Sequence, residues 1–207
     1  MPPLLRAAVV GLALVATARL ARAEPAVFRV EPERTSAAFE VSYLGFARQR
    51  GQFERTSGTI VVDRERRAGS VDLVIEARSV HTGFDLRDAF LRGESMFDAE
   101  RYPTLRFRST RLGFDGDRLA TVDGEITLRG VTAPLQLEVA RFACAPGAIA
   151  VAEARQPAAR ERCDATVGGR ISRRAFGMDF AYPLIGDEVE LEIAVSAVSV
   201  PAETAMQ

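Results

Sequence analysis

The stretch Phe84–Ser109, FDLRDAFLRGESMFDAERYPTLRFRS, begins with the pattern of a short helix. Leu86 and Phe90 lie four residues apart, a spacing that puts two side chains on one helix face. Asp85 is placed to act as the N-cap, accepting a hydrogen bond from a backbone N–H that the first turn leaves unpaired. Gly93 is placed to end the helix. We therefore predict a helix of one to two turns here.

The second half of the stretch has the pattern of a strand. Pro103 disfavours helix at the residue before it, and Leu105 and Phe107 then alternate with polar residues. A short helix cannot bury its own apolar side chains, so it must cover an apolar surface made by the rest of the chain. The apolar side chains in and just after the helix are Phe90, Leu91, Met96 and Phe97. The stretch therefore predicts a helical lid followed by a strand.

Most of the remaining chain alternates apolar and polar residues, which is typical of half-buried strands. The clearest alternation covers 71–77, 119–128 and 187–197, and further strands are predicted at 27–30, 37–44, 51–63, 135–139 and 164–172. Short turns join them, including an Asp-Gly turn at 115–116. Because no βαβ spacing appears, the sheet is expected to be antiparallel.

A long antiparallel sheet with one apolar face closes most simply into a barrel. We predict an all-β fold, an extended eight-stranded antiparallel barrel with a short helical lid and an apolar interior. A β-sandwich with a packed core is the alternative.

The first 23 residues have the features of an export signal. Arg6 supplies a positive charge, 7–18 are apolar, and Ala21-Arg22-Ala23 matches a cleavage site. The mature chain is then expected to be one domain, 24–207. No later stretch is long and apolar enough to span a membrane. These features predict export, to the periplasm if the host is a Gram-negative bacterium.

Composition narrows the chemistry. The chain has no lysine, so Schiff-base and Ser-Lys mechanisms are excluded. Removing the three arginines of the predicted signal leaves 24 arginines against 28 acidic residues. The two signs are interspersed along the sequence, so no basic stripe indicates nucleic-acid binding.

Cys144 and Cys163 are the only two cysteines. An oxidising compartment favours a disulfide between them, and their spacing differs from the C-x-x-C of redox pairs. The segment between them is rich in Ala, Pro and Arg, so we expect an exposed excursion closed by a structural bridge.

Residues with catalytic potential are few. His81 is the only histidine, and its place at a predicted strand end favours a turn or surface position over catalysis or metal binding. The sequence has neither a G-x-S-x-G elbow nor a phosphate-binding glycine loop, and we predict neither metal nor cofactor. Some carboxylates could form acid/base pairs, although capping and solvation explain them better: Asp85 with Asp88, and Asp98 with Glu100.

Two arginines near the lid leave two interpretations open. Arg87 and Arg92 could engage a ligand headgroup, or they could extend to the surface and pair with Asp88 and Glu94. An apolar interior without catalytic groups is typical of a carrier.

Four segments resemble the YceI-like family of exported, lipid-binding bacterial proteins. They are FEVSYLGFARQRGQFERTSGTI (39–60), RDAFLRGESMFDAERYPTLRF (87–107), GEITLRGVTAPLQLEV (124–139) and RRAFGMDFAYPLIGDEVELEI (173–193). The resemblance covers 28–197 and implies a lipocalin-like barrel that holds polyisoprenoid or similar lipids, with no established enzymatic activity. Family members often have a histidine in the second segment where this chain has Phe90, so a role for that histidine does not transfer.

Together these observations predict a periplasmic carrier for an isoprenoid-chain lipid of polyprenyl or quinone type, not an enzyme. The sequence leaves open whether the protein forms a homodimer. The rivals are an exported carboxylate-dependent hydrolase or isomerase, and a stress-response interaction domain with a filled core. The residues expected at the cavity and its mouth are Phe39, Val41, Phe53, Phe90, Met96, Phe97, Phe107, Phe176, Met178 and Tyr182.

Overall fold

The computed structural model describes residues 25–147 and 160–201. The predicted signal, 1–23, and the middle of the predicted excursion therefore lie outside the described residues. The strands are β1 (Ala26–Val30), β2 (Ser36–Tyr43), β3 (Ala47–Phe53), β4 (Thr56–Asp63), β5 (Ala68–Glu76), β6 (Val80–His81), β7 (Thr104–Asp115), β8 (Arg118–Leu128), β9 (Val131–Gly147), β10 (Arg160–Ser172) and β11 (Ile185–Val200). The helical elements are α1 (Asp85–Arg92) and the short 3-10 turns η1 (Pro32–Arg34), η2 (Ala77–Ser79) and η3 (Arg174–Phe176).

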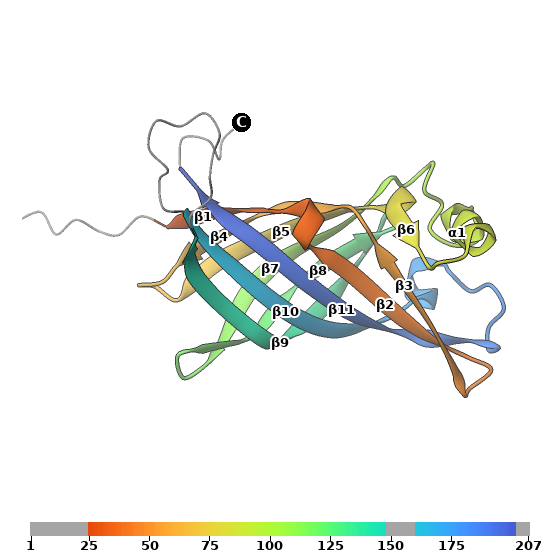
Figure 1. Ribbon diagram of the computed structural model, residues 1–207. Coiled ribbons are helices and arrows are strands. Elements are labelled where there is room, and N and C mark those ends of the chain that lie inside the picture. Colours follow the sequence, from red (N-terminus) through yellow and green to blue (C-terminus); the bar gives the residue numbers. More distant parts are fainter. Residues whose placement is uncertain (1–24, 148–159, 202–207) are drawn as a thin grey trace, which may run out of the picture.

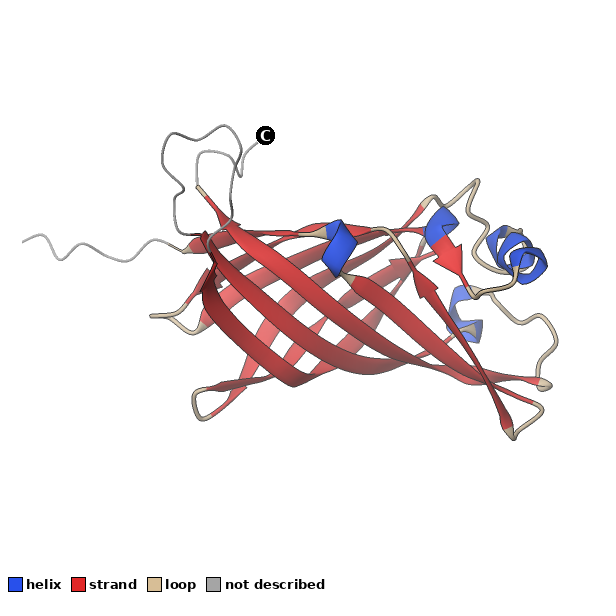
Figure 2. Ribbon diagram, viewed as in Figure 1, coloured by secondary structure: helices blue, strands red, loops and turns tan. Residues whose placement is uncertain are grey.

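The strands form one antiparallel sheet that closes on itself (Figure 1). The pairing order around the closed part is β1-β4-β5-β7-β8-β9-β10-β11, and β11 pairs back onto β1 with Val30 opposite Ala197. The predicted eight-stranded barrel is therefore confirmed, and the sandwich is not what forms. Figure 2 shows that strands make up nearly all of the wall, with the helical segments outside or at one end.

Two neighbouring positions in the wall are each filled by two short strands. β1 and β2 both pair with β11, one along each half of it. β3 and β4 continue this arrangement on the next position, since β3 pairs with β2 and β4 with β1. The single strand predicted at 51–63 is wrong in this respect, because the chain leaves the ladder at Glu54-Arg55 between β3 and β4.

The two ends of the barrel differ. The helical end carries α1, η2 and η3, together with the β2–β3 hairpin, and the opposite end carries the start of β1 and the end of β11 (Figure 1). We call the opposite end the disulfide end. Its interior is filled by side chains from several strands, including Phe28, Val30, Val139, Val195 and Ala197, all of them buried.

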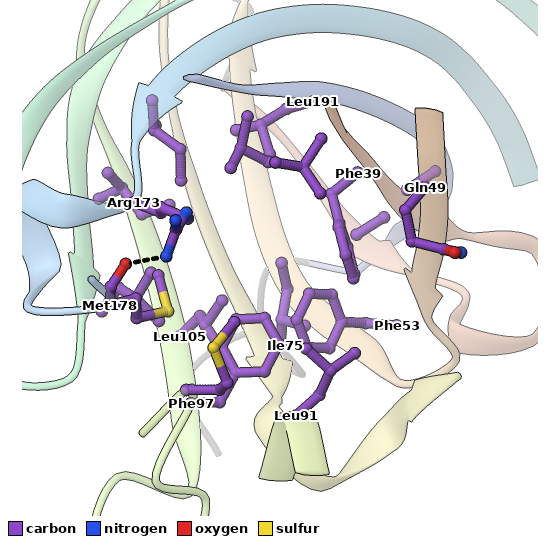
Figure 3. Close-up of a pocket in the computed structure, with 18 of the residues that line it drawn as sticks. Phe39, Gln49, Phe53, Ile75, Leu91, Phe97, Leu105, Arg173, Met178 and Leu191 are labelled. Carbon is purple, nitrogen blue, oxygen red and sulfur yellow. Dashed lines mark hydrogen bonds between the residues drawn. The ribbon is translucent and has the colours of Figure 1, made fainter. Parts of the chain in front are cut away.

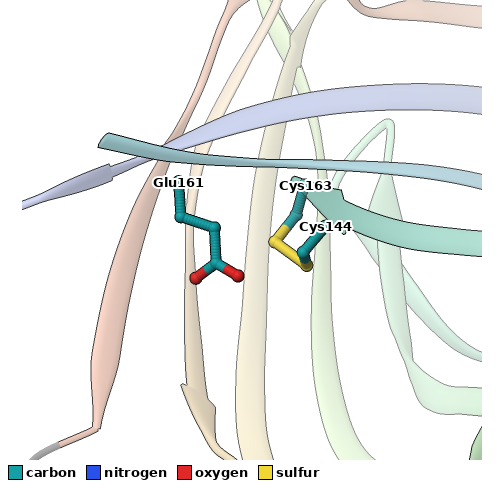
Figure 4. Close-up of side chains that lie close together, drawn as sticks. All are labelled: Cys144, Glu161 and Cys163. Carbon is teal, nitrogen blue, oxygen red and sulfur yellow. A yellow bond between two sulfur atoms is a disulfide. The ribbon is translucent and has the colours of Figure 1, made fainter. Parts of the chain in front are cut away.

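A disulfide joins β9 and β10 near this filled end, as predicted. Cys144 and Cys163 lie directly opposite each other in the ladder and are bonded. Figure 4 shows Glu161 beside them, and its carboxylate accepts hydrogen bonds from Arg64 at 2.7 Å. Although the three side chains are close enough to suggest a metal site, both sulfur atoms are committed to the disulfide.

The outer surface of the wall is held by ion pairs between neighbouring strands. Arg106 on β7 places two nitrogens against the carboxylate of Asp72 on β5, at 2.8 and 2.5 Å. Arg50 on β3 reaches Glu192 on β11 at 3.0 Å. Exposed pairs of this kind are each worth at most about 1 kcal/mol, so burial of the inward face contributes most of the stability. No helix among the described residues is long and apolar enough to cross a membrane.

Removing the disulfide should lower the free energy of unfolding without opening the barrel. Its cysteines are 19 residues apart in sequence. For a loop of that length the chain-entropy model gives about 3 kcal/mol. We expect Cys144→Ala/Cys163→Ala to lose this free energy of unfolding and therefore to unfold at a lower urea concentration. Its far-ultraviolet circular dichroism spectrum should be unchanged. Reduction of the wild type should reproduce the shift and leave the variant unaffected; equal midpoints for all samples would contradict the bridge's role.

Candidate functional site

A cavity of about 390 Å³ occupies the interior of the barrel toward the helical end. Its wall is almost entirely apolar, with contributions from β2, β5, β7, β8, β9 and β11. Figure 3 shows Phe39, Ile75, Leu105 and Leu191 arranged around it. Tyr43 and Phe90 also line it and are 45% and 40% exposed, so the cavity reaches the surface at the helical end.

Three phenylalanines pack together on one side of the cavity. Phe39 lies 5.6 Å from Phe53 and 6.1 Å from Phe97, and the rings of Phe53 and Phe97 are 5.2 Å apart. Two of the three contacts are edge-to-face, a geometry that aromatic pairs favour. Phe97 comes from the segment after α1, so this contact fixes that segment to the barrel wall.

The lid helix is attached by polar groups. Asp88, on α1, is buried, with an exposed fraction of 2%. Its carboxylate accepts hydrogen bonds from the backbone N–H of Thr82 at 2.8 Å and from the Thr82 hydroxyl at 2.5 Å. His81 Nδ1 lies 3.1 Å from the other oxygen. Burial acts to raise the pKa of Asp88, but the hydrogen bonds from Thr82 and His81 outweigh it and hold that pKa below its ordinary value.

Arg87 ties the same helix to the barrel. Its guanidinium donates to the hydroxyl and carbonyl oxygens of Thr82, at 2.8 and 2.9 Å, and to the side-chain oxygen of Gln49 on β3 at 2.7 Å. The interpretation that Arg87 pairs with Asp88 is therefore wrong, and Arg87 itself lines the cavity. Arg92 likewise donates to backbone carbonyls, those of Arg78 and Val80.

One detail of the predicted helix is wrong. The N-cap is Phe84, not Asp85, and no side chain caps the helix. Leu86 does not pack onto the barrel but is 74% exposed. Gly93 does end the helix, as predicted. The Asp88 network holds the other side of α1 against the barrel.

Arg173 is a buried cation at the cavity wall that sequence analysis did not single out. It is 2% exposed, and its guanidinium donates to the backbone carbonyls of Gly186 and Ile185, at 2.7 and 2.8 Å, and to that of Met178 (Figure 3). Burial lowers its pKa, although the acids Asp179 and Asp187 act in the opposite direction. The three bonds fasten the connection between η3 and β11 to the barrel.

The chain is similar in sequence to proteins of a known family. The model of the YceI-like domain matches residues 28–197. The chain belongs to the YceI-like family. Protein YceI of Escherichia coli O6:H1 is 29% identical over 169 residues, which are 81% of this chain and 83% of that protein.

Solved structures share the YceI-like barrel. The crystal structure of Burkholderia cenocepacia BcnA matches with a TM-score of 0.62 at 21% identity, covering 81% of this chain and 98% of that one. A structure described as a polyisoprenoid binding domain from Saccharophagus degradans matches with a TM-score of 0.57 at 18% identity, covering 84% of this chain and 98% of that one.

The structure brings most of the residues predicted for the cavity together in this YceI-like barrel. Those that line it are Phe39, Val41, Phe53, Phe90, Met96, Phe97, Phe107 and Met178. Phe176 and Tyr182 are not among the lining residues. Phe176, the last residue of η3, is buried in the core, and Tyr182 is 49% exposed with the Arg174 guanidinium 4.2 Å from its ring centre.

The carboxylates considered for acid/base chemistry do not meet at the cavity. Asp88 is held by Thr82 and His81, and Glu100 is exposed and pairs with Arg78. Asp85 is exposed at the start of α1. Neither these nor Asp98 are among the described residues that line the cavity.

Asp88→Ala should destabilise the protein by about 2 kcal/mol, because the partly buried N–H and hydroxyl of Thr82 would lose their acceptor. Asp85→Ala, on the exposed side of the same helix, is the control, with an expected loss below about 1 kcal/mol. Urea unfolding measures both; equal losses would contradict the anchoring role of Asp88.

The same anchor should depend on pH. Because folding lowers the pKa of Asp88, its contribution is fully present above the ordinary carboxyl pKa of 3.8 and is lost as the pH falls through the lower folded value. The stability difference between wild type and Asp88→Ala should therefore shrink below pH 4 or so.

Proposed function

We propose that the protein is an exported binding protein that carries an isoprenoid-chain lipid, of polyprenyl or quinone type, in the barrel cavity. The observation that carries this proposal is an apolar cavity, about 390 Å³ in volume, that opens at one end of a closed barrel. That volume lies within the range of roughly 300–1,000 Å³ typical of small-ligand pockets. Export, with delivery to the periplasm, rests on the N-terminal sequence pattern.

The chemistry of the wall suits a hydrocarbon chain. Burial of a chain against apolar side chains contributes about 0.8 kcal/mol for each CH₂ group, before the cost of ordering the ligand. A branched polyprenyl chain is stiffer than a saturated one of the same length and loses less entropy on binding. The eight predicted residues that line the cavity, together with Leu191 and Ile193, are the proposed contacts.

Polar groups near the mouth suit a headgroup. Arg48 and Gln49 on β3 and Arg87 on α1 line the cavity where it reaches the surface. Arg173 lines it from the other side and uses three of its N–H groups on backbone carbonyls. A guanidinium has five N–H donors, so some stay available for an oxygen atom of a ligand.

Family membership supports the same proposal. The Saccharophagus degradans structure with the same barrel is described as binding polyisoprenoid, and we extend that ligand class to this chain. The carboxylates lie away from the cavity, which favours binding over catalysis.

A bulky side chain in the cavity should block the ligand. Leu191 projects into the cavity from β11, whereas Glu188 on the same strand is exposed. We expect Leu191→Trp to weaken binding of decylubiquinone and of farnesyl phosphate by at least about tenfold, or 1.4 kcal/mol. Glu188→Trp is the matched control and should bind as the wild type does. Native mass spectrometry measures binding in the wild type and both variants. Quenching of the introduced tryptophan is the second readout in the two variants.

The wild type purified without detergent provides the decisive comparison. We expect its native mass spectrum to show either copurifying lipid or uptake of one of the two probes. Protein that carries no lipid and takes up neither probe would overturn the proposed function, whatever the behaviour of the variants.

A further inference from the structure

The exposed apolar side chains gather at one end of the molecule. Nine of the twelve large apolar side chains that are exposed in the described residues belong to three short segments, 43–46, 84–90 and 180–184. The most exposed of each segment are Phe46 at 83%, Leu86 at 74% and Leu184 at 57%. These segments are the β2–β3 hairpin, α1 with the residue before it, and the connection from η3 to β11, all at the helical end (Figure 1).

Two contacts join the three segments into one surface, which we call the apolar rim. The rings of Phe90 and Phe180 are 4.8 Å apart, so α1 meets the connection before β11. The backbone N–H of Leu44 donates to the carbonyl of Leu184 at 2.7 Å, so the hairpin meets it too. A contiguous apolar surface on a water-soluble wall of ion-paired strands marks an interaction site.

The rim is continuous with the cavity. Tyr43 and Phe90 belong to the rim and also line the cavity mouth. Whatever covers the rim therefore also covers the entrance, and an apolar ligand could pass between the two without crossing water.

Four arginines at this end lack the ion pairs that those of the wall have, although Arg48 of β3 pairs with Glu40 and Glu190. Among the described residues, Arg87, Arg92, Arg129 and Arg174 form no ion pair with a carboxylate, whereas wall arginines such as Arg106 do. Arg87 lies 5.8 Å from the ring centre of Phe84, and Arg174 lies 4.2 Å from that of Tyr182. Asp85 is the exposed acid within the rim segments, and Asp179, just before the third segment, is also exposed.

We propose that the rim docks on the surface of a lipid bilayer that contains anionic phospholipid. Aromatic rings with adjacent arginines are typical of protein surfaces that enter the membrane interface, where the rings lie among headgroups and the guanidinium groups meet phosphate. Anionic lipid adds attraction for arginines whose guanidinium groups form no ion pair within the protein. The continuity of the rim with the cavity favours a bilayer over a second copy or a protein partner, because a bilayer is itself apolar beneath its headgroups.

Vesicle flotation tests this proposal. We expect the wild type to float with vesicles of phosphatidylethanolamine and phosphatidylglycerol and to float less with vesicles of phosphatidylcholine alone. Phe46→Ser/Leu86→Ser/Leu184→Ser should lower the vesicle partition coefficient by at least about tenfold, because three interfacial side chains are lost. Phe114→Ser/Phe142→Ser removes two exposed phenylalanines outside the rim and should bind as the wild type does.

Each other outcome overturns the proposal. A wild type that stays unbound to both kinds of vesicle would do so, as would equal losses in the two sets of variants. Sedimentation equilibrium identifies self-association: a wild-type dimer that the triple variant cannot form, without vesicle binding, assigns the rim to a second copy. Uptake of decylubiquinone from solution is measured in parallel, so failure of docking is distinguishable from failure of the proposed ligand binding.

Discussion

Closure of the barrel by pairing of β1 with β11 is the constraint on which the rest of the structure depends. The pairing of β1 with β11 leaves no free edge in the ring of eight strands, each of which has a partner on both sides. The short strand β6 lies outside this ring and pairs only with β3. Closure also assigns one face of every strand to the interior. The alternation of apolar and polar residues along the sequence therefore becomes a division between an apolar interior and an ion-paired exterior.

Side-chain size then decides where this interior is filled. At the disulfide end, Phe28 and its neighbours on β9 and β11 occupy the space between the strands. Toward the helical end, some inward positions are glycine, and an aromatic ring covers the backbone there. A Cβ on Gly51 would lie 2.4 Å from the Phe39 ring, and one on Gly124 would lie 2.6 Å from that of Phe107. Rings that lie against the wall leave the centre open, so the cavity is a consequence of how large and small residues are paired across strands.

Alternation along the chain was enough to predict the strands and the barrel, because the period of a strand is a local property. Eight of the ten residues expected at the cavity line it, but they make up only part of its wall. The alternation did not show the break at Glu54-Arg55, since the apolar face continues on both sides of it. The burial of Asp88 and Arg173 was also not predictable. Each is satisfied by backbone groups that only the folded chain brings near: Thr82 reaches Asp88 through a tight turn, and three carbonyls of 178–186 converge on Arg173. Tyr182 was misplaced for the same reason, because Arg174 holds it outside.

The polar attachment of α1 explains why Leu86 faces outward, although Phe90 and Leu91 of the same helix line the cavity. A short amphipathic helix normally buries its apolar side. Here Asp88 and Arg87 occupy the side toward the barrel, and their bonds to Thr82 and Gln49 hold the helix in place without help from Leu86. Leu86 is consequently free for an external contact, on the same helix as Phe90, which lines the cavity and packs against Phe180. A lid held by hydrophobic packing would have to expose new apolar surface on meeting a membrane, whereas this one already presents it.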